Sequence, residues 1–131
     1  NYYWKEQILV NSSDTREKAK AYARLWRERN PELSKNAELK KVYGVDLFWY
    51  NKTKEEQNGV CAICGNSETS VDSRSGTPRD LAVDHDHTTG KIRGLLCRGC
   101  NQGLGNFQED VQRLKKALEY LQHHSDVPSN T

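Results

Sequence analysis

Two CxxC pairs set the tightest limit on how this chain can fold. CAIC occupies residues 61–64 and CRGC occupies residues 97–100, and together they use all four cysteines of the 131-residue chain. A CxxC turn lets two thiolates reach one zinc ion at about 2.3 Å, and two such turns complete a tetrahedral site. The alternatives are two redox dithiols or disulfides. Because only 34% of the residues are hydrophobic, the core is small and would need such a staple. We therefore expect structural zinc bound by Cys61, Cys64, Cys97 and Cys100.

The start of the chain bears on the cellular setting. Lys5, Glu6 and Gln7 stand where the apolar centre of a signal peptide would lie. No stretch approaches the roughly 18 apolar residues of a membrane span. We expect a reducing, cytoplasmic location with no membrane partner, where paired cysteines more often bind metal than each other.

Apolar periodicity and stop residues predict an α+β fold around the staple. N-cap residues at 11–14 precede a helix to residue 29, and further helices are expected at 32–43 and 46–58, ended by Gly44 and Gly59. Residues 66–79 form a polar loop, 81–83 and 92–96 form a hairpin, and a short helical turn follows Cys100. An amphipathic helix is expected at 109–124. The chain then divides into a helical basic arm at 1–58, a zinc-bound core at 59–124 and a disordered tail at 125–131.

The basic charge gathers in the first helix. Six Lys or Arg residues fall within 16–29 against two acidic residues. Such a run can be a solvated helix face, or it can lie along duplex DNA with Arg24 and Arg27 on phosphates. The same helix carries Tyr22 and Trp26 in one apolar stripe, so the arm could instead pair with its copy in a homodimer.

A polar cluster lies at the end of the first strand. Asp84 and His85 end that strand, and Asn101 directly follows the second CxxC pair, so the zinc staple should bring Asn101 beside Asp84. A histidine with a pKa near neutral can take a proton from water. Carboxylate and amide oxygens are ligands suited to Mg²⁺. The cluster therefore indicates metal-assisted hydrolysis of a phosphodiester.

Each residue of this cluster also has a simpler interpretation. His85 and His87 could be zinc ligands, although four cysteines already fill a tetrahedral site. Asp84 and Asp86 could be solvated turn residues, and Asn101 could be a helix N-cap. We take Asp86 as scaffold.

Three segments together resemble the recombination endonuclease VII family, which belongs to the HNH, or ββα-metal, nucleases. They are GVCAICG at 59–65, LAVDHDHTTG at 81–90 and RGLLCRGCN at 93–101. The resemblance covers residues 59–107 and, more weakly, the helix before them. It implies a ββα-metal core of α+β class and a nuclease active on duplex, nicked or branched DNA, encoded by a phage or mobile element and acting in the host cytoplasm.

The resemblance also implies roles for single residues. Asp84 and Asn101 would bind the catalytic Mg²⁺ or Mn²⁺, and His85 would be the general base. His87 would contact the phosphate or support the site. Metal stabilisation of the leaving 3′ oxygen would give 5′-phosphate and 3′-hydroxyl ends. Arg93 and Arg98 flank the site and could hold phosphates.

Two hypotheses of different class therefore stand beside the nuclease. A zinc-knuckle DNA-binding module without catalysis would have no need of Asp84, His85 and Asn101 together. A thiol-disulfide enzyme would need reactive free thiols, which tightly bound zinc would exclude.

Overall fold

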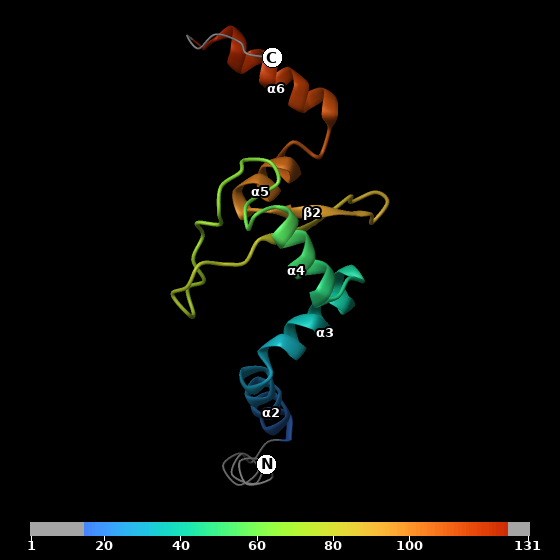
Figure 1. Ribbon diagram of the computed structural model, residues 1–131, viewed down its shortest axis with the longest axis vertical. Helices are drawn as coiled ribbons and strands as arrows, with labels where there is room; N and C mark the ends of the chain where they lie inside the picture. Colours follow the sequence, from blue (N-terminus) through green and yellow to red (C-terminus); the bar gives the residue numbers. More distant parts are fainter. Residues whose placement is uncertain (1–14, 126–131) are drawn as a thin grey trace. The chain divides into compact units, whose positions relative to one another are not determined.

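The computed structural model describes residues 15–125, and it divides the chain into two units, residues 1–51 and 52–131. The N-cap cluster expected at 11–14, and residues 126–131 of the tail expected at 125–131, lie outside the described residues. The predicted α+β class is confirmed. None of the described helices is both long and apolar enough to cross a membrane. The elements are α2 (Thr15–Arg29), α3 (Pro31–Tyr43), α4 (Leu47–Glu56), β1 (Ala82–His85), β2 (Ile92–Leu96), α5 (Arg98–Asn106) and α6 (Val111–His123) (Figure 1).

The first unit is helical, and α2 and α3 end where the sequence predicts, whereas α4 ends two residues before the predicted residue 58. Pro31 is the first residue of α3, where its missing N–H costs no hydrogen bond. Gly44 ends α3 in the left-handed conformation at φ 73°, which glycine adopts without penalty. The Asp46 side chain accepts a hydrogen bond from the Trp49 N–H at 2.8 Å at the start of α4. Leu39 and Tyr50 are the side chains buried in this unit's described residues.

The second unit is built on one antiparallel hairpin. β1 pairs with β2 so that Val83 lies opposite Leu95 and Asp84 lies opposite Gly94, and a bulge follows between Asp84 and His85. Val83 and Leu95 are both buried, with Leu95 fully so. The strand ends at His85, as predicted, so both predicted site residues of β1 are held by strand pairing.

The outer edge of β2 is covered by the end of the helix before it. The Gln57 side chain accepts from the Leu95 N–H at 3.0 Å and donates to the carbonyls of Leu95 and Val60 at 2.9 Å. Gly94 allows this approach, because a Cβ there would lie 3.3 Å from the Gln57 amide oxygen. The backbone N–H and carbonyl of Leu95 are therefore hydrogen-bonded without a third strand.

The helix after the second CxxC pair begins earlier than predicted. Instead of a short turn after Cys100, α5 starts at Arg98 and runs nine residues. The reason is that Cys97 is its N-cap: the Cys97 sulfur accepts from the Cys100 N–H at 3.4 Å. α6 follows with Asp110 as N-cap, and none of its predicted stripe (Val111, Leu114, Leu118, Leu121) is buried within residues 15–125.

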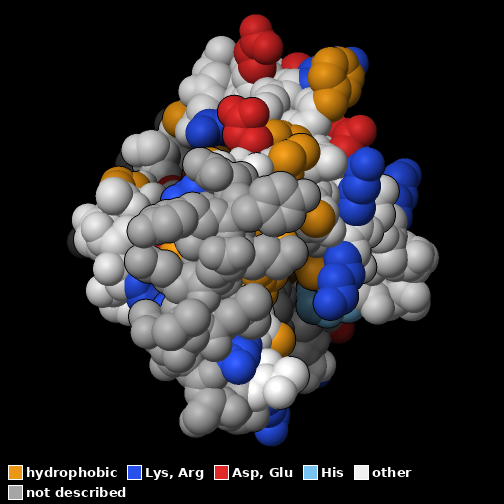
Figure 2. Space-filling view, turned by 90° about the horizontal axis from the view of Figure 1, so that it is seen from below, with side chains coloured by type: hydrophobic (Ala, Val, Ile, Leu, Met, Phe, Trp, Pro, Cys, Tyr) orange, Lys and Arg blue, Asp and Glu red, His pale blue; other side chains and the backbone are white. Residues whose placement is uncertain are grey.

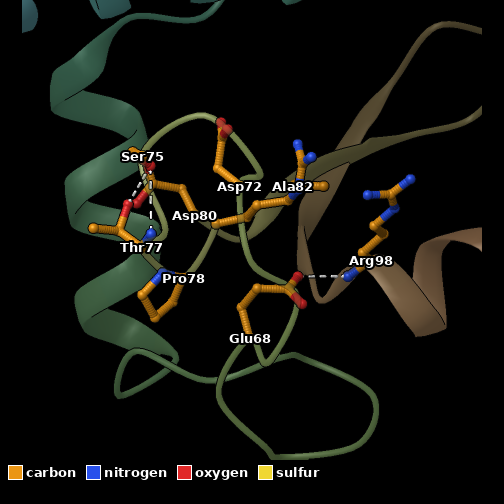
Figure 3. Close-up of a pocket in the computed structure, with 9 residues that line it drawn as sticks. Glu68, Asp72, Ser75, Thr77, Pro78, Asp80, Ala82 and Arg98 are labelled. Carbon is orange, nitrogen blue, oxygen red and sulfur yellow. Dashed lines mark hydrogen bonds between the residues drawn. The ribbon is translucent and has the colours of Figure 1, made fainter.

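The polar loop at 66–80 is fastened to the start of α5 by Glu68. One Glu68 oxygen accepts from the Arg98 backbone N–H at 2.7 Å, and the other accepts from the Ser70 N–H at 3.0 Å (Figure 3). A carboxylate at a helix N-terminus also meets the positive end of the helix dipole. The hydrogen bonds from Ser70 and then Arg98 hold the pKa of Glu68 below its ordinary value.

Replacing Glu68 should therefore destabilise the second unit in a pH-dependent way. We expect Glu68→Ala to lower the free energy of unfolding by about 1 kcal/mol at neutral pH, as for loss of a helix cap. Because the folded pKa is depressed, this contribution is full above the unfolded value of about 4.3 and is lost as pH falls through the folded pKa. Urea denaturation of the zinc-loaded protein gives the first quantity, and NMR titration of the carboxyl carbon gives the second.

Glu56→Ala is the matched control, because Glu56 is the exposed last residue of α4 and has no partner within residues 15–125. Equal stability of Glu68→Ala and wild type, or a Glu68 pKa at or above about 4.3, would contradict the capping role.

Candidate metal centre and active site

The four cysteine sulfurs converge in the second unit. Their Sγ atoms all lie within 4.8 Å of one another, and Cys64 and Cys97 are 3.8 Å apart. A tetrahedral zinc–thiolate site with bonds of about 2.3 Å places its sulfurs about 3.8 Å apart. All four cysteines are unbridged, which rules against the predicted alternative of disulfides. Four cysteines this close together suggest a zinc site.

The surroundings of the Cys61 and Cys100 sulfurs shift their pKa values in opposite directions. Burial raises the pKa of the Cys61 thiol, but hydrogen bonds from Cys97, Cys64 and Ile63 outweigh it and lower that pKa to about 6. Burial and its sulfur neighbours raise the pKa of Cys100 to about 12. Cys61 is therefore the sulfur whose surroundings most favour the thiolate, and a bound cation would have to displace protons from the others.

The two predicted site histidines lie together. His85 ends β1 and His87 follows it by two residues, a spacing that places side chains of extended chain on the same side. Their rings stack with centroids 4.7 Å apart and planes 21° apart. The two rings thus lie together at the end of the hairpin, with His85 half-buried and His87 exposed.

Asp84 is a buried carboxylate bound by an arginine. Only 6% of it is exposed, and Arg93 donates to both of its oxygens, from Nε at 2.7 Å and from Nη2 at 3.0 Å. The same Nη2 also reaches the His85 carbonyl at 3.1 Å and Glu109 Oε1 at 2.7 Å. The hydrogen bonds to Asp84 and then to Glu109 raise the pKa of Arg93 further above its ordinary value. Arg93 is therefore a fixed cation between two carboxylates.

Asn101 lies inside α5 and not at its start. It is the fourth residue of the helix, and its backbone N–H donates to the Cys97 carbonyl at 3.0 Å. The interpretation of Asn101 as an N-cap is therefore wrong, because Cys97 holds that position. α5 lies against β1, which carries Asp84. The half-buried Asn101 amide has no hydrogen-bond partner within residues 15–125.

These residues fit a hard divalent cation in part. Asp84 is already paired with the guanidinium of Arg93, and Asn101 offers an amide oxygen on the adjacent helix. Two protein oxygens are few, but Mg²⁺ usually keeps several waters and needs only one or two carboxylates. Within residues 15–125 the cysteine quartet is the only set of three or more His, Cys, Asp or Glu ligands that converges.

The predicted DNA-contacting arginines lie in different places. Arg98 lines a hollow of about 460 Å³ together with Arg79 and three acidic residues of the 66–80 loop (Figure 3). Arg24 and Arg27 are exposed on α2 in the first unit. Arg93 faces Asp84 and Glu109, with its Nη1 unbonded within the described part of the chain.

Sequence reasoning missed Glu109. It lies in the turn between α5 and α6, is 18% exposed at its side chain, and contacts both Arg93 and His87. The turn uses two consecutive non-glycine residues at positive φ, Gln108 at 56° and Glu109 at 55°. The only local sequence signal is Asp110 as an N-cap, and it gives no indication of where Glu109 points.

Comparisons with known proteins assign the chain to a family. The recombination endonuclease VII family matches residues 36–123, which include the cysteine quartet, Asp84, His85 and Asn101. The "Gene 59 protein" of Mycobacterium phage L5 is 40% identical over 81 residues, and that of Mycobacterium phage D29 is 37% identical over 81 residues. Each alignment covers 61% of this chain and 45% of the relative, so the chain spans less than half the length of these curated relatives. No solved structure matches at a significant level. Since the family match covers more than half of the sequence, the chain belongs to the recombination endonuclease VII family.

Proposed function

We propose that this chain is an HNH-type DNA endonuclease that hydrolyses the phosphodiester backbone with one Mg²⁺ or Mn²⁺ ion. The observation that carries the proposal is the meeting of β1, which ends in Asp84 and His85, with α5, which carries Asn101. A family of phage proteins supports a phage-encoded enzyme acting on DNA in the host cytoplasm. Its substrate class is duplex, nicked or branched DNA.

In this mechanism the chain's own residues position the water and the phosphate. His85 accepts the proton of the attacking water, because a half-buried imidazole at the end of β1 can serve as base near neutral pH. Asp84 and Asn101 hold the divalent ion, which supplies charge neutralisation at the phosphate and the leaving oxygen. His87, stacked on His85, contacts the phosphate or keeps the His85 ring in place.

Zinc has a separate, structural role in the proposal. The four cysteines fill a tetrahedral site, so no coordination position remains for substrate. Because the quartet joins the turn at 61–64 to the first residues of α5, bound zinc fixes the helix that carries Asn101.

The helical first unit supplies DNA affinity. Arg24 and Arg27 lie on one side of α2 three residues apart, and both are exposed. The face drawn in Figure 2 shows Lys and Arg side chains beside hydrophobic ones. Tyr22 and Trp26, 39% and 37% exposed, line a hollow of about 440 Å³ together with Arg27, and this is the surface through which a homodimer would form.

The catalytic proposal predicts that His85→Ala loses cutting while it keeps binding. We expect a fall in cleavage rate of about 100- to 10,000-fold, which is the usual contribution of a general base. Labelled four-way junction and linear duplex of the same sequence, in Mg²⁺, measure rate and substrate preference together. His123→Ala, which removes a histidine from α6 outside the site, is the matched control. If wild type binds both substrates in Mg²⁺ or Mn²⁺ and cuts neither, the chain is a non-catalytic DNA-binding module.

The arm proposal predicts a salt-dependent loss of affinity. Replacing Arg24 and Arg27 by Ala should weaken binding equally for unrelated DNA sequences, because phosphate contacts do not read bases. The slope of log affinity against log salt should fall by about 0.9 per residue replaced. Lys18→Ala is the control for each single Arg→Ala variant, because it also removes one positive charge and helical spacing places Lys18 away from both arginines. An unchanged salt slope in the double variant, with a weakened dimer in sedimentation, would assign α2 to dimerisation instead.

A further inference from the structure

Glu109 makes the contacts of a residue that organises the proposed site from outside it. Its Oε1 accepts from Arg93 Nη2 at 2.7 Å and lies 3.4 Å from His87 Nε2. Its Oε2 accepts from the His87 backbone N–H at 3.4 Å. The side chain is 18% exposed and therefore largely withdrawn from water. The Glu109 carboxylate thus links the turn after α5 to Arg93 on β2 and to His87, which follows β1.

The backbone fixes where this carboxylate points. Gln108 and Glu109 both adopt positive φ, a conformation uncommon for residues with a side chain and often found at functional sites. The Glu109 N–H donates to the Leu104 carbonyl at 2.8 Å, and the next residue, Asp110, caps α6. Hydrogen bonds at both ends of the turn therefore fix the backbone at Glu109, and with it the direction of the carboxylate.

Arg93 is the group for which two carboxylates compete. Its Nε and Nη2 occupy both oxygens of Asp84, while Nη2 also reaches Glu109. Each Asp84 oxygen keeps a second lone pair, but an oxygen that accepts a hydrogen bond from the Arg93 cation is a weaker ligand for a metal ion. Releasing a guanidinium from a buried carboxylate is costly unless another anion holds it. Glu109 is that second anion.

We propose that Glu109 is a positioning residue that anchors Arg93, so that Asp84 can turn an oxygen to the divalent ion. The inference rests on the proposed function, because it takes Asp84 as a metal ligand. With Glu109 present, Arg93 stays beside the site, held by one carboxylate, with Nη1 directed to solvent or phosphate. Without Glu109, Arg93 has Asp84 as its one strong partner and competes fully with the metal.

A simpler role for Glu109 would be to add negative charge near the metal. Both roles predict weaker metal binding in Glu109→Gln, but they differ once Arg93 is removed. If Glu109 acts through Arg93, its replacement has no further effect in an Arg93→Gln background. If it acts by its own charge, its replacement costs the same in both backgrounds.

The experiment measures Mn²⁺ affinity by EPR on zinc-loaded protein without DNA. We expect Glu109→Gln to weaken Mn²⁺ binding by about 10- to 100-fold, as is usual when the partner of a metal ligand is lost. In Arg93→Gln protein the same change should have less than about a twofold effect. Asp110→Asn is the matched control: it removes the adjacent charge, but Asn still caps α6.

Folding of each variant is checked by zinc content and circular dichroism. Should Arg93→Gln fail to fold, Arg93→Lys replaces it as background, because lysine keeps the charge but cannot bridge two carboxylates with a planar fork. An equal loss in both backgrounds, or no loss in either, would overturn the role of Glu109 while the proposed function stands. If Asp84→Asn binds Mn²⁺ as tightly as wild type, Asp84 is not a ligand, and the proposed mechanism and this inference both fail.

Discussion

The convergence of four sulfurs is the interaction on which the second unit depends. The hairpin has two strands and few buried side chains, which is too little hydrophobic surface to hold the loop and two helices around it. The quartet joins the turn at 61–64 to the start of α5, and Cys97 caps that helix with the same sulfur that faces the cluster. The same Cys97 sulfur would therefore both bind zinc and cap α5.

A single arginine partly neutralises the two carboxylates near the end of β1. Burial of Asp84 would be costly alone, and Arg93 compensates it by binding both oxygens. A single guanidinium shared by Asp84 and Glu109 leaves one net negative charge at the place where a divalent cation is proposed to bind. His85 and His87 stack beside this group, so the proposed proton acceptor and the proposed cation site lie on the same hairpin end.

The sequence predicted what is set by spacing and not what is set by turns. The cysteine quartet, the hairpin and the pair of histidines follow from residues whose separation is fixed by ligand or strand geometry, and the structure brings each set together. The sequence did not reveal the roles of three residues, Glu109, Glu68 and Gln57. Each contacts a partner 16 to 38 residues away in the sequence, and the conformation of the intervening loops decides that contact. Asn101 was given a cap as one alternative because the start of α5 was placed too late. Arg93 was assigned to phosphate, since nothing in its local sequence shows that two carboxylates surround it.

The most direct test of the account is a zinc titration of the metal-depleted protein followed by amide NMR. If zinc on the sulfur quartet holds the hairpin together, the amide signals of Val83 and Leu95, which report the paired strands, should be collapsed without zinc. They should become dispersed as one equivalent of zinc is added. Mg²⁺-dependent DNA cleavage should return over the same range of zinc. A hairpin whose signals stay dispersed without metal, or DNA cleavage by zinc-free protein, would contradict the claim that the sulfur quartet holds the site together.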